Sequence, residues 1–266
     1  MKHHDHQIAY LRPEQIVAQI RHNPIAYLPL GPLEWHGPHL PFGTDPLNAE
    51  TTALRVAEIT GGLVFPTLYW GTERERSPEA LEQIGFERSD WIIGMDFPSN
   101  SVQSLYAREE VFAILIREQI RLISNMGFQL IVIISGHGAA NHLAALQRLA
   151  AEHHHLGGCK ILVVMPFLAD AQGQLHVGHA DRTETALMLA HYPETVSPET
   201  LPALPQPLRN VDWGVVDSDT FEGNPTPERT VREMHDPRRA SPAEGAAIAA
   251  QVVDQIVHLV NTCRPV

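Results

Sequence analysis

The stretch EWHGPHLPFGTD, at residues 34–45, combines acids and histidines with prolines and glycines that keep a loop irregular. Glu34 and His36 are two positions apart, so an extended backbone would point both side chains to the same side. Asp45 follows at the far end of the stretch. A carboxylate and an imidazole on one side, with a second carboxylate nearby, are a beginning of a metal site.

Two later stretches add more groups of the same kind. SGHGAAN, at residues 135–141, places His137 between two glycines, which let a backbone or a substrate approach closely. HVGHADRTETA, at residues 176–186, carries His179 and Glu184. Both stretches therefore offer groups that could meet those of the first.

Together these stretches supply mixed nitrogen and oxygen ligands. The pooled set is Glu34, His36, Asp45, His137 and Glu184. Such a set exceeds the three protein ligands that one catalytic zinc takes. It fits two ions about 3.5–4 Å apart that share a bridging carboxylate, and Asp45 is the natural bridge. Zn²⁺ and Mn²⁺ both accept these ligands, with Fe²⁺ as a further candidate, and the absence of cysteine argues against a purely structural zinc.

Each of these groups also has a simpler interpretation. A histidine after a strand is often a hydrogen-bonded structural residue, and an acid such as Glu34 can be a solvated loop residue. GHG could belong to a dinucleotide-binding loop, but the third glycine of GxGxxG and the later acid are missing. Ser135 lacks the G-x-S-x-G surroundings of a nucleophile.

The elements that must position these groups alternate between short apolar runs and longer helical patterns. Strands are predicted at 25–30, 61–70, 129–135 and 159–166. Helices are predicted at 46–59, 103–125, 142–155, 183–192 and 241–260, with Asp45 and Ser241 as N-caps. This alternation predicts one α/β domain over residues 1–266, with a mostly parallel sheet and helices on both faces. The polar stretches follow predicted strands, at the sheet edge where such folds collect functional groups.

Two segments are less regular, residues 71–102 and 201–240, and both are predicted to form pocket walls or subunit contacts. The candidate pocket residues in them are Glu73, Arg74, Asp96 and Trp213.

Composition excludes several classes of protein. The net charge of -12 argues against nucleic-acid binding and against docking to an anionic membrane. The two cysteines allow no disulfide framework, and the first residues lack the apolar core of a secretory signal. We therefore expect a soluble cytoplasmic protein.

Four motifs occur in an order typical of one family. LPLGPLEWHGPHLPFGTD resembles the opening motif of the creatininase (creatinine amidohydrolase) family, and SGHGAAN resembles its second motif. GHADRTETALM is similar to the third motif, and HDPRRASPAEG resembles the ending.

The resemblance implies a compact α/β domain with a binuclear centre of the Zn/Mn type. It implies hydrolysis of a C–N bond in a small cyclic or linear amide by a metal-bound hydroxide. It also implies a homo-oligomer, often a hexamer. By position, four of the pooled residues match metal ligands, and Glu184 matches the fifth.

The sequence departs from the family pattern in places. Ala139 stands where creatininase has an acid two residues after the histidine of the second motif, and Asp181 and Arg182 alter the third motif. The segment that shapes the substrate pocket also differs, so the sequence does not predict creatinine as the substrate.

His179 and Glu184 are the candidate catalytic residues. His179 is the candidate proton donor to the leaving nitrogen, because histidine titrates near working pH. His39 is expected either to orient a ligand carboxylate or to stiffen the loop. Two alternatives stay open: a lactone or phosphoester hydrolase at the same centre, or a metal-binding protein without catalysis.

Overall fold

The computed structural model describes residues 5–155, 157–169, 175, 178–217 and 230–264. Its centre is a four-stranded sheet in the order β2-β1-β3-β4, in which each pair of neighbours is parallel. The strands are β1 (Ile25–Leu30), β2 (Leu63–Val64), β3 (Leu130–Ser135) and β4 (Lys160–Val164). The predicted α/β fold with a parallel sheet is confirmed.

The two central strands explain how the sheet forms. Every residue of β1 and of β3 is buried, as expected for strands that are covered on both faces. The register pairs Leu30 with Ser135, so both strands end at the same level. The segments that follow them therefore start side by side at one edge of the sheet.

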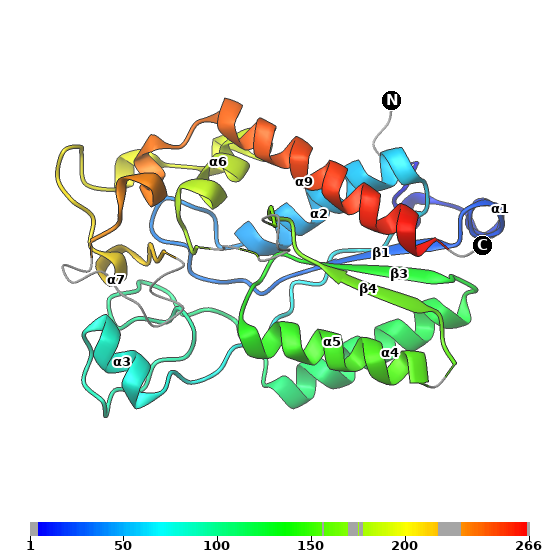
Figure 1. The fold of residues 1–266 in the computed structure, drawn as a ribbon, viewed down its shortest axis with the longest axis horizontal. Helices are drawn as coiled ribbons and strands as arrows, with labels where there is room; N and C mark the ends of the chain where they lie inside the picture. The colour runs from blue at the N-terminus through cyan, green and yellow to red at the C-terminus, as the bar shows by residue number, and fades with distance from the viewer. Residues whose placement is uncertain (1–4, 156, 170–174, 176–177, 218–229, 265–266) are drawn as a thin grey trace.

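Helices cover both faces of the sheet (Figure 1). The α-helices are α1 (Pro13–His22), α2 (Thr44–Thr60), α3 (Pro78–Ile84), α4 (Glu109–Asn125), α5 (Ala140–His155), α6 (Arg182–His191), α7 (Asn210–Trp213) and α9 (Pro242–Cys263). Short 3-10 helices span Ile8–Tyr10, Pro193–Thr195, Pro198–Thr200, Glu233–His235 and Pro237–Arg239. On one face, α4 and α5 pack in a core with Leu28 and Ile131. On the other face, α2 and α9 pack in a second core with Tyr27 and Val132. None of the helices in the described ranges is both long and apolar enough to cross a membrane.

Three predicted boundaries are wrong. The second strand is continuous only over Leu63–Val64, because Pro66, which has no N–H to donate, follows soon after them; Leu68 pairs with Leu30 only as an isolated bridge. The helix expected from residue 103 begins at Glu109, because backbone N–H groups of Leu105 and Ala107 bond to loop carbonyls instead. Asp45 is not an N-cap: the helix begins at Thr44, which leaves the Asp45 carboxylate free for other contacts. Ser241 does cap its helix, by accepting a hydrogen bond from the Glu244 N–H at 3.2 Å.

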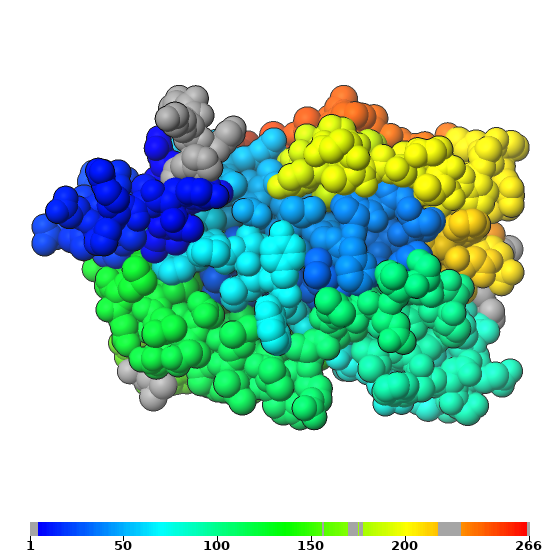
Figure 2. All heavy atoms as spheres, turned by 180° about the vertical axis from the view of Figure 1, so that it is seen from behind, coloured from blue at the N-terminus to red at the C-terminus, as the bar shows by residue number. Residues whose placement is uncertain are grey.

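The two irregular segments share a small core of their own. Leu81, Ile92 and Phe97 from the first segment pack with Val211 and Val216 from the second. Helices α3, α6 and α7 gather beyond one end of the sheet, whereas α1 lies toward the other (Figure 1). In the view from behind, residues around α3 form a lobe at the end opposite the N-terminal residues (Figure 2). The first segment therefore forms a lobe at the end of the sheet, joined to the second segment through this small core.

Candidate metal centre

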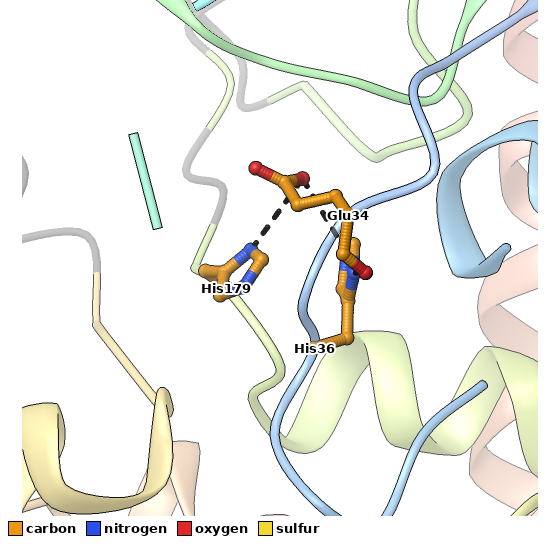
Figure 3. A group of neighbouring side chains, drawn as sticks. All are labelled: Glu34, His36 and His179. Carbon is orange, nitrogen blue, oxygen red and sulfur yellow. Dashed lines mark hydrogen bonds and ion pairs between the residues drawn. The ribbon is translucent and has the colours of Figure 1, made fainter. Parts of the chain in front are cut away.

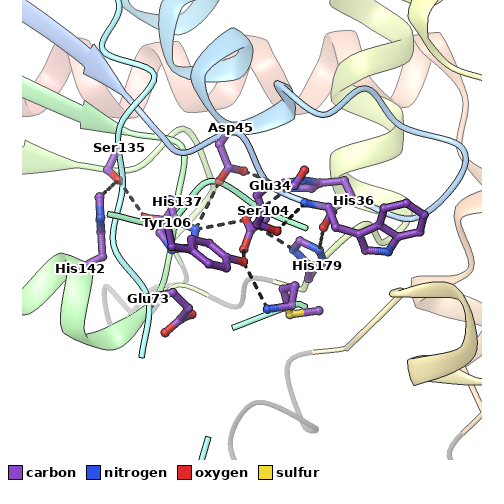
Figure 4. Close-up of polar contacts among 12 residues, drawn as sticks. Glu34, His36, Asp45, Glu73, Ser104, Tyr106, Ser135, His137, His142 and His179 are labelled. Carbon is purple, nitrogen blue, oxygen red and sulfur yellow. Dashed lines mark hydrogen bonds and ion pairs between the residues drawn. The ribbon is translucent and has the colours of Figure 1, made fainter. Parts of the chain in front are cut away.

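The three polar stretches meet at the carboxyl edge of the sheet (Figure 4). Glu34 and His36 lie on the loop after β1, and Asp45 lies in the first turn of α2. His137 follows β3, and Glu184 lies in the first turn of α6. All of these side chains are 5% exposed or less, so the cluster is withdrawn from water.

Two glycines allow α2 to approach the strand ends. A Cβ on Gly136 would lie 2.0 Å from the backbone oxygen of Asp45. A Cβ on Gly31 would lie 2.6 Å from the Cβ of Asp45. Since real Cβ atoms do not come so close to other atoms, glycine at both positions lets Asp45 sit between the ends of β1 and β3.

Asp45 is at the centre of the cluster. Its Oδ1 lies 3.0 Å from Nε2 of His36, and its Oδ2 lies 3.3 Å from Nδ1 of His137. Glu184 Oε2 lies 3.7 Å from the same nitrogen of His36, and Glu34 Oε2 lies 3.2 Å from Nδ1 of His137. The two oxygens of one carboxylate therefore face two different histidines.

His179 reaches the cluster from the segment before α6 (Figure 3). Its Nε2 lies 2.5 Å from the backbone oxygen of Trp35, to which it donates a hydrogen bond, and its Nδ1 lies 4.0 Å from Glu34 Oε2. The rings of His36 and His179 are 4.2 Å apart between centroids. Trp35 thus fixes the tautomer that turns Nδ1 toward Glu34.

Burial and mutual contact shift the pKa values in this cluster. Burial opposes a charged His36, but the carboxylates of Asp45 and Glu184 outweigh it and raise the pKa of His36 to about 10. Burial raises the pKa of Glu184 to about 8. Burial, reinforced by the charge of His36, lowers the pKa of His179 to about 3. The negative field that raises the pKa of His36 would attract a divalent cation in the same way.

Glu184 is held by the turn before α6. Asp181 caps this helix by accepting hydrogen bonds from the N–H groups of Thr183 at 2.8 Å and Glu184 at 3.1 Å. Ala180 has a φ of 52°, unusual for a residue with a side chain, and its N–H donates to Glu184 Oε2 at 2.5 Å. The Asp181 departure from the family pattern therefore has a structural role in placing Glu184.

The donor set fits divalent ions. Three overlapping groups each bring their ligand atoms within 4.8 Å of one another: Glu34, His36 and His179; Glu34, Asp45 and His137; and His36, Asp45 and Glu184. Nε2 of His36 and Oδ2 of Asp45 are buried and, although each lies 3.0–3.3 Å from an oppositely charged partner in the cluster, neither makes a hydrogen bond of good geometry among the described residues. Nδ1 of His36 bonds the backbone oxygen of Glu34 at 3.1 Å, which directs Nε2 into the cluster. Buried orphan atoms of this type are suitable metal ligands.

Tyr106 contacts the cluster and was not predicted from the sequence. Its hydroxyl donates a short hydrogen bond to Glu34 Oε1 and accepts one from the N–H of Met95 at 3.2 Å. Tyr106 lies 72 positions from Glu34, in a stretch predicted to be helical, so no local signal could identify it.

A second feature that was not predicted is a chain of hydrogen bonds that ends at the backbone of His137. The N–H of Thr72 donates to Nδ1 of His142 at 3.3 Å, so Nε2 carries the proton and donates to the Ser135 hydroxyl at 3.0 Å. That hydroxyl donates to the backbone oxygen of His137 at 2.8 Å. Burial holds the pKa of His142 well below its usual range, which keeps its imidazole neutral in this chain of hydrogen bonds.

His39, on the loop after β1, is buried and contacts α6. Its Nε2 lies 3.1 Å from the hydroxyl oxygen of Thr185, the neighbour of Glu184. The described contacts of His39 thus tie the loop to α6 rather than to a ligand carboxylate. Its role in orienting ligands stays a prediction.

A cavity of about 620 Å³ lies over the cluster. Glu34, Asp45, His137, His179 and Glu184 line it, together with Glu73 and Arg74 from the segment 71–102. Ala139 also lines the cavity, where the family pattern has an acid.

Asp96 and Trp213 are not among the described residues that line this cavity. Asp96 accepts a hydrogen bond from the Ser104 N–H at 2.8 Å, and Trp213 packs in a cluster with Leu40 and Val215.

The fold and the cluster define a class: an α/β protein with a buried centre of histidines and carboxylates at the carboxyl edge of a parallel sheet. A family model described as Creatininase, creatinine amidohydrolase, matches residues 9–260. This chain belongs to the creatininase family. A comparison with curated protein sequences found no match.

Several solved structures share the fold. "Creatininase Mn" has a TM-score of 0.67 and 22% identity, covering 98% of this chain and 99% of that one. A mutant creatininase described as the Zn-Zn type has a TM-score of 0.66 and 22% identity, covering 97% and 98%. A mutant creatininase complexed with creatine has a TM-score of 0.66 and 21% identity, covering 98% and 99%.

Proposed function

We propose that this protein is a metal-dependent amidohydrolase that hydrolyses the C–N bond of a small cyclic or linear amide at a binuclear centre. The observation that carries this proposal is the position of Asp45, whose two oxygens face His36 at 3.0 Å and His137 at 3.3 Å. A carboxylate placed in this way is suited to bridge two ions.

The residues that would hold the ions follow from the three overlapping groups. Asp45 would be shared, with His36 and Glu184 on one side and Glu34 and His137 on the other. Bound divalent ions would supply Lewis-acid polarisation of the amide carbonyl and acidification of a water molecule. Zn²⁺ and Mn²⁺ are the preferred candidates because both accept imidazole and carboxylate, and related proteins are described as Mn and Zn-Zn forms. Fe²⁺ accepts the same ligands.

His179 is proposed to carry the proton to the leaving nitrogen. Nε2 of this imidazole keeps its proton on the backbone oxygen of Trp35, so Nδ1 is the atom that would take up the proton released by the attacking water and pass it to the leaving nitrogen. The backbone oxygen of Trp35 holds the other N–H and would stabilise the imidazolium that forms. His179 is also a candidate metal ligand, because its ring nitrogen lies close to ligand atoms of Glu34 and His36. The His179→Gln variant described below distinguishes a proton carrier from a metal ligand.

The substrate is proposed to be a small molecule. A cavity of about 620 Å³ is within the size range of small-molecule sites, and a related creatininase is described as complexed with creatine. The cytoplasmic location, the single-domain boundaries over the whole chain and the homo-oligomeric state, with a hexamer favoured, stay predictions from the sequence.

The test is a substrate panel with controlled metal content. Purified protein is loaded with Zn²⁺ or Mn²⁺ and assayed against cyclic and linear amides, lactones and phosphoesters, before and after chelation. We expect metal-dependent hydrolysis of amides. Faster turnover of lactones or phosphoesters would favour a different hydrolase, and no turnover of any compound would favour a binding protein.

A His179→Gln variant tests the proton carrier. If His179 moves a proton, kcat should fall by about 100-fold or more while metal content stays unchanged. Loss of bound metal in this variant would instead identify His179 as a ligand.

A further inference from the structure

The guanidinium of Arg76 is a cationic group in the lining of the cavity over the metal centre. The residue is partly buried and lines the same cavity as Glu34 and His137. Its Nε donates to the backbone oxygen of Gly94 at 2.7 Å, and its Nη2 lies 3.3 Å from the sulfur of Met95. The guanidinium also lies over the ring of Phe97, 5.7 Å from the centroid. These contacts fix the guanidinium but use only some of its five N–H donors.

No carboxylate of the described residues forms an ion pair with Arg76. Two other partly buried arginines lie close to carboxylates, Arg182 to Glu244 at 2.9 Å and Arg238 to Asp236 at 2.6 Å. Arg76 has no carboxylate oxygen within 4.0 Å among the described residues. Burial lowers its pKa despite the attraction of Glu73 and Glu34, so these acids do not offset the loss of solvent.

Glu73, the nearest candidate counter-ion, is directed elsewhere. Its Oε1 accepts the N–H of Arg74 at 2.7 Å, and its Cγ would lie 2.3 Å from a Cβ on Gly94. Burial raises the pKa of Glu73, which weakens it as a partner for a cation. A desolvated guanidinium without a matched acid is a suitable receptor for an anion that arrives with a ligand.

We propose that the substrate of this enzyme carries an oxyanion, a carboxylate or a phosphate, and that Arg76 binds it. The proposal rests on the proposed function and names a substrate class for that site. Arg76 is a specificity-determining residue, because it would hold one end of the substrate while the amide lies over the metal centre.

A continuous set of contacts joins Arg76 to the centre. Arg76 contacts Met95, the N–H of Met95 donates to the Tyr106 hydroxyl, and that hydroxyl donates to Glu34. The proposed anion site is therefore connected to the metal ligands by direct contacts. A substrate bound at Arg76 would be held at a fixed position with respect to Glu34.

The test uses three probes that carry the same formamide group and differ at the other end: N-formylglycine, N-formylaminomethylphosphonate and the neutral N-formylglycine methylamide. Binding to the metal-loaded protein is measured by calorimetry, and metal content is measured for every variant. We expect one anionic probe to bind about 10- to 100-fold more tightly than the neutral one, the range of a charge-assisted pair. Whether the carboxylate or the phosphonate binds more tightly identifies the oxyanion.

Arg76→Gln should abolish this preference, and Arg117→Gln, at an exposed arginine of α4 outside the cavity, is the matched control, which should leave it within about threefold. Arg76→Lys keeps the charge without the fork and should retain only part of the preference. If Arg76→Gln does not fold, a severalfold loss in Arg76→Lys decides the question. An unchanged preference in the Arg76 variants, or no preference in the wild type, would overturn the proposal.

Binding and turnover separate this inference from the function itself. An Arg76-dependent preference without hydrolysis of any amide would leave the anion site standing and reject the amidohydrolase. Hydrolysis of neutral amides, with no effect of the Arg76 variants on anion binding, would support the amidohydrolase function and reject the anion site.

Discussion

The floor and the wall of the cavity are built in different ways. The floor comprises the histidines and acids of the metal centre, Glu34, His36, Asp45, His137, His179 and Glu184, and it lies where the parallel strands end. The wall is the segment 71–102, which packs through a small core around Leu81 and Phe97 that also includes Val211 and Val216. The floor is fixed by the main core of the protein, whereas the wall depends on far fewer apolar contacts.

This difference assigns two tasks to two regions. The floor carries the groups that resemble the family motifs, and they are suited to hold ions and to move a proton. The wall carries charged groups such as Glu73 and Arg76, which face the space where a substrate would lie. We infer that the floor determines the reaction and that the wall selects the substrate.

The largest effect is expected from a change in the floor. His36→Ala removes the imidazole that lies 3.0 Å from Asp45, and leaves buried carboxylates without their partner. In chelator-treated protein the free energy of unfolding should fall by about 3–5 kcal/mol, as measured by urea denaturation. His258→Ala, on the exposed side of α9, should change it by no more than about 0.5 kcal/mol. Equal losses in the two variants would show that the floor is not a coupled cluster.

A change in the wall should be confined to it, and should lower the global free energy of unfolding less than His36→Ala does. Leu81 is 1% exposed, and Leu81→Ala should cost about 2–5 kcal/mol of local stability. Hydrogen exchange should then increase in residues 78–97 and stay unchanged in β1 and β3, with metal content preserved. Leu122→Ala, at a position 44% exposed on α4, is the control. Faster exchange in the central strands would contradict the separation of wall and floor.

The smallest effect is expected where the two regions meet. Tyr106→Phe removes the hydroxyl that donates to Glu34, while the ring remains. Metal affinity should fall by about 10- to 100-fold, which competition with a chelating dye can measure. Tyr192→Phe removes a hydroxyl that bonds Thr51 at 3.0 Å, outside the cavity, and should leave metal affinity unchanged. A loss of the same size in both variants would mean that Tyr106 acts only on overall stability.

The sequence could predict the floor better than the wall for physical reasons. Long apolar runs predicted the central strands, and in a parallel sheet the segments that follow such strands must meet at one edge. This is why His137 could be grouped with Glu34 and His36, about 100 positions earlier in the chain, before their distances were known.

Other contacts had no signal of this kind. Tyr106 reaches Glu34 only because the backbone before α4 bonds to loops, and the predicted helix at 103–125 concealed it. Trp213 and Asp96 are pocket candidates from irregular segments; the described contacts of Trp213 are with Leu40 and Val215, and Asp96 accepts a hydrogen bond from Ser104, so their role in the pocket stays a prediction. In segments without periodicity, tertiary contacts decide where a side chain points.

The central claim is that Asp45 joins two metal ions in one centre. The most direct measurement is the number of ions bound per chain, determined by mass spectrometry of metals on desalted protein, for the wild type and for Asp45→Ala. The account predicts two ions per wild-type chain and a loss of both tight binding and amide hydrolysis in the variant. Two ions and full activity in Asp45→Ala, or a single ion in a fully active wild type, would contradict it.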